Sequence, residues 1–74
     1  MYRFEAATLP TNAGSGVTIA SGSAPNERAA RSGLERGLAH IAPSVASQVA
    51  AQAERVFTDF PEFGITVRVF ESRF

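Results

Sequence analysis

Few side chains in this sequence could carry out nucleophilic or metal chemistry. His40 is the single histidine, and the chain has no cysteine. Because a zinc site needs at least three suitable protein ligands, His40 alone predicts no metal centre. His40, Asp59 and a serine could be drawn as a hydrolytic triad, but no serine lies in a pattern that marks a nucleophile on a strained turn. We interpret His40 as a structural or surface residue.

The acidic residues show no pairing of the kind that general acid–base catalysis needs. Glu54, Asp59 and Glu62 gather only around an expected helix end and its turn. A chain of 74 residues also has a thin core, since a domain of this size buries only about 60% of its unfolded surface. We therefore expect a non-catalytic protein that uses no metal and no cofactor.

Arginine and phenylalanine together form the strongest candidate for a binding surface. Arg68 and Phe70 share the outer face of an expected strand, Arg73 and Phe74 follow, and Arg3 of another strand should lie close by. Exposed aromatic side chains interleaved with arginine are typical of protein-binding hot spots and of base-stacking surfaces. The alternative is that the two phenylalanines only cover a sheet edge. We take these five residues as the predicted partner-binding set.

A second candidate is an anion site at a helix start. Ser21-Gly22-Ser23 is expected to join a strand to a helix, with Arg28 one turn further on. Free amides at a helix N-terminus attract anions, so Ser21, Ser23 and Arg28 could hold a phosphate or a partner's carboxylate. The simpler interpretation is a plain cap made by Ser23. Gly14-Ser15-Gly16 precedes a strand, so we interpret it as a hairpin loop and not as a dinucleotide site.

Small residues recur every four positions along the first expected helix. Ala29, Gly33 and Gly37 would form a smooth ridge on one face. Glycine inside a helix costs about 1 kcal/mol relative to alanine and usually marks a close approach. Packing within the chain is the first interpretation, and a dimer contact is the second.

These residues must be positioned by strands that flank a helical region, because the apolar pattern changes from alternation to helical spacing and back. Residues 2–6 alternate and residues 17–20 form a second short strand, so the two are predicted to pair as a hairpin with a long loop. Residues 65–71 alternate strictly and predict a third strand, with Ile65, Val67 and Val69 facing the helices.

Two helices are expected between the second and third strands. The first begins near Pro25, and the second runs from about residue 43 to residue 57, although one helix kinked at Pro43 would also fit. The residues expected in the buried stripe are Leu34, Leu38, Ile41, Val45, Val49 and Val56. The predicted fold is α+β, a single domain over residues 1–74 with a three-stranded, mainly antiparallel sheet and two helices on one face, in the order β-β-α-α-β.

The composition argues against several kinds of partner. Seven arginines balance seven acidic residues, so the formal net charge is zero, which disfavours nucleic acid and anionic membrane surfaces. The longest uncharged stretch, residues 37–53, contains His40, Pro43 and several serines and glutamines, so no membrane span is predicted. Residues 1–5 hold no apolar run, so no secretory signal is expected, and a cytoplasmic location is the default.

The expected function is binding to a protein partner by occupying its surface. Small size without cysteine or a catalytic set is typical of phage or mobile-element inhibitors of host defence, anti-CRISPR proteins among them, but this is an analogy of size that no motif carries. The alternative is a dimerisation or accessory subunit of a bacterial complex, with the chain as a homodimer. A small nucleic-acid-binding regulator is a weaker alternative, because the chain has no RNP-like string and no excess positive charge.

Overall fold

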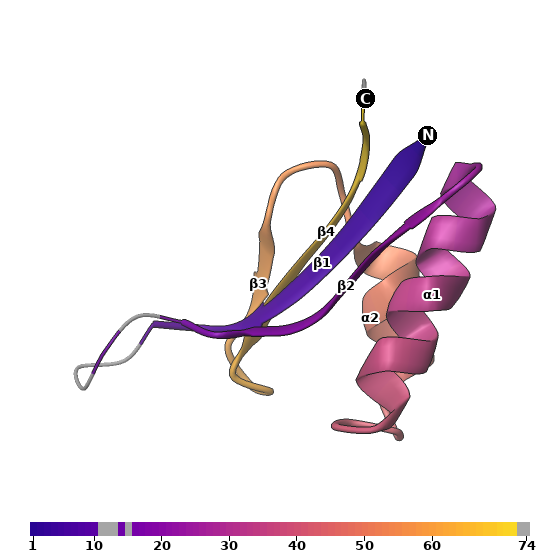
Figure 1. Ribbon diagram of the computed structural model, residues 1–74. Helices are drawn as coiled ribbons and strands as arrows, with labels where there is room; N and C mark the ends of the chain where they lie inside the picture. The colour runs from indigo at the N-terminus through magenta and orange to yellow at the C-terminus, as the bar shows by residue number, and fades with distance from the viewer. Residues whose placement is uncertain (11–13, 15, 73–74) are drawn as a thin grey trace.

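The computed structural model describes residues 1–10, 14 and 16–72, which form two helices packed on one face of a four-stranded antiparallel sheet (Figure 1). The elements in chain order are β1 (Tyr2–Thr8), β2 (Thr18–Ala24), α1 (Glu27–Ala39), α2 (Ala46–Gln52), β3 (Thr58–Phe60) and β4 (Ile65–Glu71). The fold is therefore the expected small α+β domain with one strand more than the sequence predicted.

The first and last strands lie side by side in the centre of the sheet, whose order is β2-β1-β4-β3. β1 and β4 pair over their full lengths, from Tyr2 opposite Glu71 to Thr8 opposite Ile65. β1 also pairs with β2, which confirms the predicted hairpin. β1 is thus bonded on both sides, while β2 and β3 are the edge strands.

The core lies between the helices and one face of the sheet. Ile65, Val67 and Val69 are buried there, as the alternation of the last strand predicted. Among the described residues, twelve apolar ones are buried: Ala6, Ala30, Leu34, Leu38, Ala46, Val49, Ala50, Ala53, Phe60, Ile65, Val67 and Val69. Small residues are frequent in this set, so the layers approach closely.

α1 packs closely against β1 and β2. A methyl group added at Gly37 would lie 2.8 Å from the Cβ of Ala20, and one added at Gly33 would lie 2.5 Å from Cε1 of Phe4. A methyl group added at Gly22 would meet the same ring, 2.7 Å from its Cζ. The ring of Phe4 is therefore held between the backbones of β2 and α1.

The start of α1 differs from the sequence prediction. Asn26 is the N-cap, and its Oδ1 accepts a hydrogen bond from the backbone N–H of Ala29 at 2.8 Å. Ser23 was the predicted cap, but it lies inside β2, opposite Arg3 of β1. Because β2 continues to Ala24, the chain leaves the sheet later than expected and the helix begins at Glu27.

The region after α1 also differs from the sequence prediction. Pro43 lies in the turns between α1 and α2, so the chain makes two helices rather than one kinked helix. α2 is shorter than predicted and ends at Gln52. Ile41 and Val56, predicted to be buried, are 50% and 63% exposed because neither lies in a helix.

The sequence analysis did not predict β3, because this strand has only three residues and shows no alternating pattern. It pairs with β4, with Phe60 opposite Ile65. Within the described chain, neither helix has the length and apolar character needed to cross a bilayer.

Candidate functional site

The helices leave one face of the sheet uncovered, and we call the outward-facing residues of its two central strands the open sheet face (Figure 1). These residues are Arg3, Glu5 and Ala7 of β1 and Thr66, Arg68 and Phe70 of β4. Their register places Arg3 opposite Phe70 and Glu5 opposite Arg68. The fold thus brings together three of the five residues predicted to bind a partner.

Arg68 lies between two aromatic rings. The guanidinium carbon is 4.2 Å from the ring centroid of Phe70 and 4.5 Å from that of Phe57. Phe57 comes from the connector between α2 and β3, and its side chain is 45% exposed. A cation over an aromatic face is attracted by about 0.5–1 kcal/mol per ring at exposed sites. The two rings therefore hold the plane of the guanidinium in one orientation.

An ion pair fixes the direction of the same side chain. The Arg68 Nη2 donates to Oε1 of Glu5 at 3.0 Å, and the two side chains are 31% and 27% exposed. The Arg68 Nε is buried and has no hydrogen-bond partner among the described residues. Arg68 is thus held by three neighbours while it keeps part of its hydrogen-bonding capacity unused.

Arg3 extends the open sheet face towards β2. Its Nη1 donates to Oγ of Ser23 at 3.0 Å. The other two predicted partner-binding residues, Arg73 and Phe74, lie outside the described residues.

The anion site predicted at Ser21, Ser23 and Arg28 is not assembled. Both serines belong to β2, where Ser21 lies opposite the acidic Glu5 and Ser23 opposite Arg3. Arg28 is an exposed residue of α1, which packs on the other face of the sheet. The amides of α1 are capped by Asn26 instead, so the three residues do not converge on one point.

The small-residue ridge of Ala29, Gly33 and Gly37 packs within the chain. Gly33 is buried against Phe4, Gly37 lies on Ala20, and Ala29 is half-buried. This is the first of the two interpretations given above. The ridge explains why two glycines are accommodated inside a helix, since a side chain at either position would meet the sheet.

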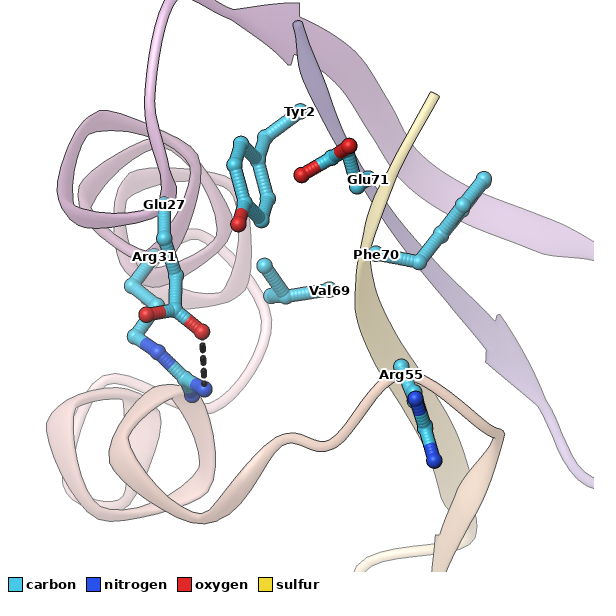
Figure 2. Close-up of a pocket in the computed structure, with 7 residues that line it drawn as sticks. All are labelled: Tyr2, Glu27, Arg31, Arg55, Val69, Phe70 and Glu71. Carbon is cyan, nitrogen blue, oxygen red and sulfur yellow. Dashed lines mark hydrogen bonds and ion pairs between the residues drawn. The ribbon is translucent and has the colours of Figure 1, made fainter. Parts of the chain in front are cut away.

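A cleft of about 330 Å³ lies on the helix side of the sheet, between the start of α1, the start of β1 and the end of β4 (Figure 2). Its lining residues are Tyr2, Glu27, Arg31, Arg55, Val69, Phe70 and Glu71. The carboxylate of Glu71 points towards the ring of Tyr2, while Glu27 pairs with Arg31 at 3.2 Å. Negative charge on Glu71, then burial and Glu27, raise the pKa of Tyr2 above its ordinary 10.0.

The charges in this cleft balance one another. The carboxylates of Glu27 and Glu71 line the cleft together with Arg31 and Arg55, and the pKa of Tyr2 is raised above an ordinary value that already keeps the phenol neutral at physiological pH. His40 is exposed at the end of α1, far along the helix from Glu27. In the described part of the chain, no three histidine, cysteine or acidic residues lie close enough together to hold a metal ion.

The sequence prediction missed Phe57 and Glu5 as members of the candidate site, and Glu5 joins it only because β1 pairs with β4. The apolar pair Val56-Phe57 was assigned to the end of a long second helix, whereas both residues lie in the connector after α2. The available signal was that two large apolar residues directly precede a segment rich in proline and glycine. No family model, no curated protein and no solved structure matches this chain, so its function must be inferred from the site itself.

Proposed function

We propose that this chain is a non-catalytic domain that binds a protein partner through the open sheet face and occupies the partner's surface. The observation that supports the proposal is the position of Arg68 between Phe57 and Phe70, with Glu5 as its ion-pair partner. Binding orders side chains at an entropic cost, so an arginine that is already ordered loses less on association. Tyrosine, tryptophan and arginine dominate hot spots, usually in a setting of apolar contacts.

The chemistry of the site favours a protein over a nucleic acid. A sheet that binds RNA stacks bases on aromatic residues of its central strands, and excess positive charge surrounds them. Here β1 contributes no aromatic residue to the open sheet face, and Glu5 neutralises Arg68. A partner that offers an apolar side chain to Phe57 and an oxygen acceptor to Arg68 would match both features.

Two biological settings fit a binding face of this kind. The chain would act by steric occlusion as a phage or mobile-element inhibitor of host defence, of which anti-CRISPR proteins are examples. Alternatively, it would serve as an accessory subunit of a bacterial complex. Adding the purified chain to the identified partner separates the two, because occlusion lowers the partner's activity at equal molar amounts and an accessory subunit does not.

The proposal is tested by affinity capture from a nuclease-treated bacterial lysate. The baits are wild type, Phe57→Ser, Arg68→Ala with Phe70→Ala, and the control Arg36→Ala, which removes an exposed arginine from α1. Circular dichroism first establishes that each bait is folded. We expect wild type and Arg36→Ala to capture the same protein in equal molar amounts, and both site variants to lose it.

Two results would overturn the proposal. Retention of the partner by folded site variants would show that the open sheet face is not the binding surface. Loss of the partner from the nuclease-treated lysate, together with steep loss of binding as salt is raised, would indicate a nucleic acid in its place.

A further inference from the structure

The two edges of the sheet differ in how well they are protected from another strand. β3 has three residues, includes the charged Asp59 and is followed directly by Pro61. β2 has seven residues, Thr18 to Ala24, with no charged residue and no proline among them. Natural proteins usually shield an edge strand by charge, proline, a bulge or short length. Apart from Pro25, which follows it directly, β2 has one such feature, a register shift opposite Ala6 and Ala7 at its start.

The remainder of β2 pairs regularly with β1, and its side chains are all small. From Ala20 to Ala24 the register with β1 continues without a break. Alternate side chains are alanine or glycine on the helix side and serine on the open side. Within the described chain only β1 pairs with β2, so the N–H and C=O groups on its other edge have no strand partner. Small side chains let another strand approach this free edge closely.

The sequence of this segment is its own mirror image. Ala20-Ser21-Gly22-Ser23-Ala24 is identical in both directions about Gly22. In a two-fold dimer, residue i of one copy contacts residue j of the other and j contacts i, so antiparallel pairing about Gly22 places each small side chain opposite an identical one, with no clash and no like charges. We infer that β2 pairs with β2 of a second copy of this chain, antiparallel and centred on Gly22. Ser21 of one copy then lies opposite Ser23 of the other, and Ala20 opposite Ala24.

The charge of the chain is consistent with this occupant. Its formal net charge is zero, so two copies approach without overall repulsion. Serine hydroxyls directly opposite each other across a strand pair hydrogen-bond and stabilise the pair. The product is a continuous eight-stranded sheet, counted as twice the four strands of one chain. Because the two-fold axis is perpendicular to that sheet, the open sheet faces of the two copies, each with its Arg68, lie on the same side of the dimer.

The register is tested with two double variants that differ in one residue. In Ser21→Lys with Ser23→Lys, each lysine lies opposite a lysine of the other copy, so pairing is opposed. In Ser21→Lys with Ser23→Glu, each lysine lies opposite a glutamate, so pairing is supported. We expect the lysine–glutamate variant to have a dimer dissociation constant lower than that of the lysine–lysine variant by roughly tenfold or more.

Sedimentation-velocity ultracentrifugation over a wide concentration range measures the dissociation constants, and circular dichroism checks the fold. A control with Ser44→Lys and Ser47→Lys adds the same charge at exposed positions outside the sheet, and it should dimerise like wild type. Both test variants lose the Ser23 hydroxyl that accepts from Arg3, but glutamate at position 23 attracts Arg3 of the same chain and lysine repels it. Urea denaturation of each variant therefore measures this difference in monomer stability separately. A wild type that stays monomeric at every concentration overturns the inference. So does equal behaviour of the two folded test variants.

The inference stands apart from the proposed function. The folded lysine–lysine monomer keeps Phe57, Arg68 and Phe70, so it should still capture the protein partner. Loss of dimerisation and loss of partner capture are therefore separate readouts.

Discussion

Phe4 is the residue that sets the distance between α1 and the sheet. Its ring is enclosed by Gly22 on one side and Gly33 on the other, where added methyl groups would lie 2.7 and 2.5 Å from ring carbons. A flexible side chain usually moves away from such a contact. Here movement away from one glycine brings the ring towards the other, so the position tolerates little extra volume.

Replacing Gly33 by alanine should therefore destabilise the protein, although alanine favours a helix. Overpacking of a core typically costs about 1–3 kcal/mol, and we expect a decrease of this order in the free energy of unfolding. Urea denaturation measures it. Phe4→Leu in the Gly33→Ala background should recover part of the loss, and the exposed Ser32→Ala on the same helix should change little. A Gly33→Ala variant more stable than wild type would contradict this packing.

Tyr2 provides a second test at the residue scale, because it is the single tyrosine and the chain has no tryptophan. Its pKa is raised in the folded protein, chiefly by Glu71, so the folded state holds the phenolic proton more tightly than the unfolded chain does. The resulting stability is present below pH 10.0, the unperturbed pKa, and is lost as pH rises through the folded pKa.

Glu71→Gln should lower the pKa of Tyr2 towards its ordinary value, and Glu27→Gln should lower it less. The appearance of tyrosinate absorbance during an alkaline titration of the folded protein reports the pKa directly. Glu62→Gln, in the turn before β4, is the matched control and should leave the titration unchanged. An unchanged pKa in Glu71→Gln would show that this carboxylate does not act on the phenol.

Chemical type and alternation were enough to predict part of the site. Arg68 and Phe70 could be placed on an outer face because they alternate with Val67 and Val69. Ser23 and Asn26 are both good helix caps, and the sequence offers no means to choose between them. The choice depends on how far β2 stays paired with β1, which is a property of tertiary structure.

At the scale of elements, α2 depends on a side chain from another helix. It has seven residues, and no side chain caps its N-terminus. The Arg31 Nη1 of α1 donates to the backbone oxygens of Ala50 at 2.9 Å and Ala53 at 2.7 Å, and Nη2 donates to Glu27. Helices this short are unstable alone, so Arg31 both satisfies the end of α2 and joins it to α1.

Arg31→Met should lower the free energy of unfolding by about 1.5 kcal/mol, the lower part of the range for hydrogen bonds to charged groups, since the side chain is 31% exposed. Thermal denaturation measures the stability, and amide exchange in residues 46–52 should become faster. Arg28→Met removes an exposed arginine from the same helix and should have little effect. If Arg31→Met and Arg28→Met lowered the free energy of unfolding equally, the hydrogen bonds from Arg31 to α2 would not be what stabilises this helix.

The elements differ in how strongly the sequence encodes them. β4 combines strict alternation with β-branched residues, so its bounds were predicted correctly. β3 forms because Thr58, Asp59 and Phe60 pair with residues 65–67 after a tight turn. A segment of three residues is too short to show an alternating pattern, so the sequence does not predict this strand. α2 ends where Arg31 caps it, and the apolar Val56 and Phe57 beyond that point suggested a longer helix.

For the whole molecule, stability depends on very few large side chains. In the part of the chain that the structure describes, five of the twelve buried apolar residues are alanines, at positions 6, 30, 46, 50 and 53, and the largest fully buried ones are Leu34, Leu38, Val49 and Val67. Small domains bury little surface and are correspondingly marginal. A single cavity can therefore remove a large share of the folding free energy.

Leu34→Ala should cost about 2–5 kcal/mol, enough to unfold a large fraction of the chain at moderate temperature. Ile41→Ala, at a position predicted to be buried but 50% exposed, should stay within about 0.5 kcal/mol of wild type. Peak dispersion in a proton–nitrogen NMR spectrum distinguishes folded from unfolded protein. Similar losses in both variants would indicate that Ile41 packs more tightly than the structure shows.

The central pairing of β1 with β4 has a consequence during synthesis. β1 leaves the ribosome first of the six elements and β4 last, yet each forms a full ladder with the other. Until β4 emerges, the nascent chain holds β1 with one edge open and lacks Val67 and Val69, which complete the core. Unpaired edges and exposed apolar surface are what chaperones bind and what aggregates share. The chain can complete its fold only after β4 has been synthesised. Until then, the unpaired edge of β1 and the apolar core residues are exposed to chaperones and to other chains.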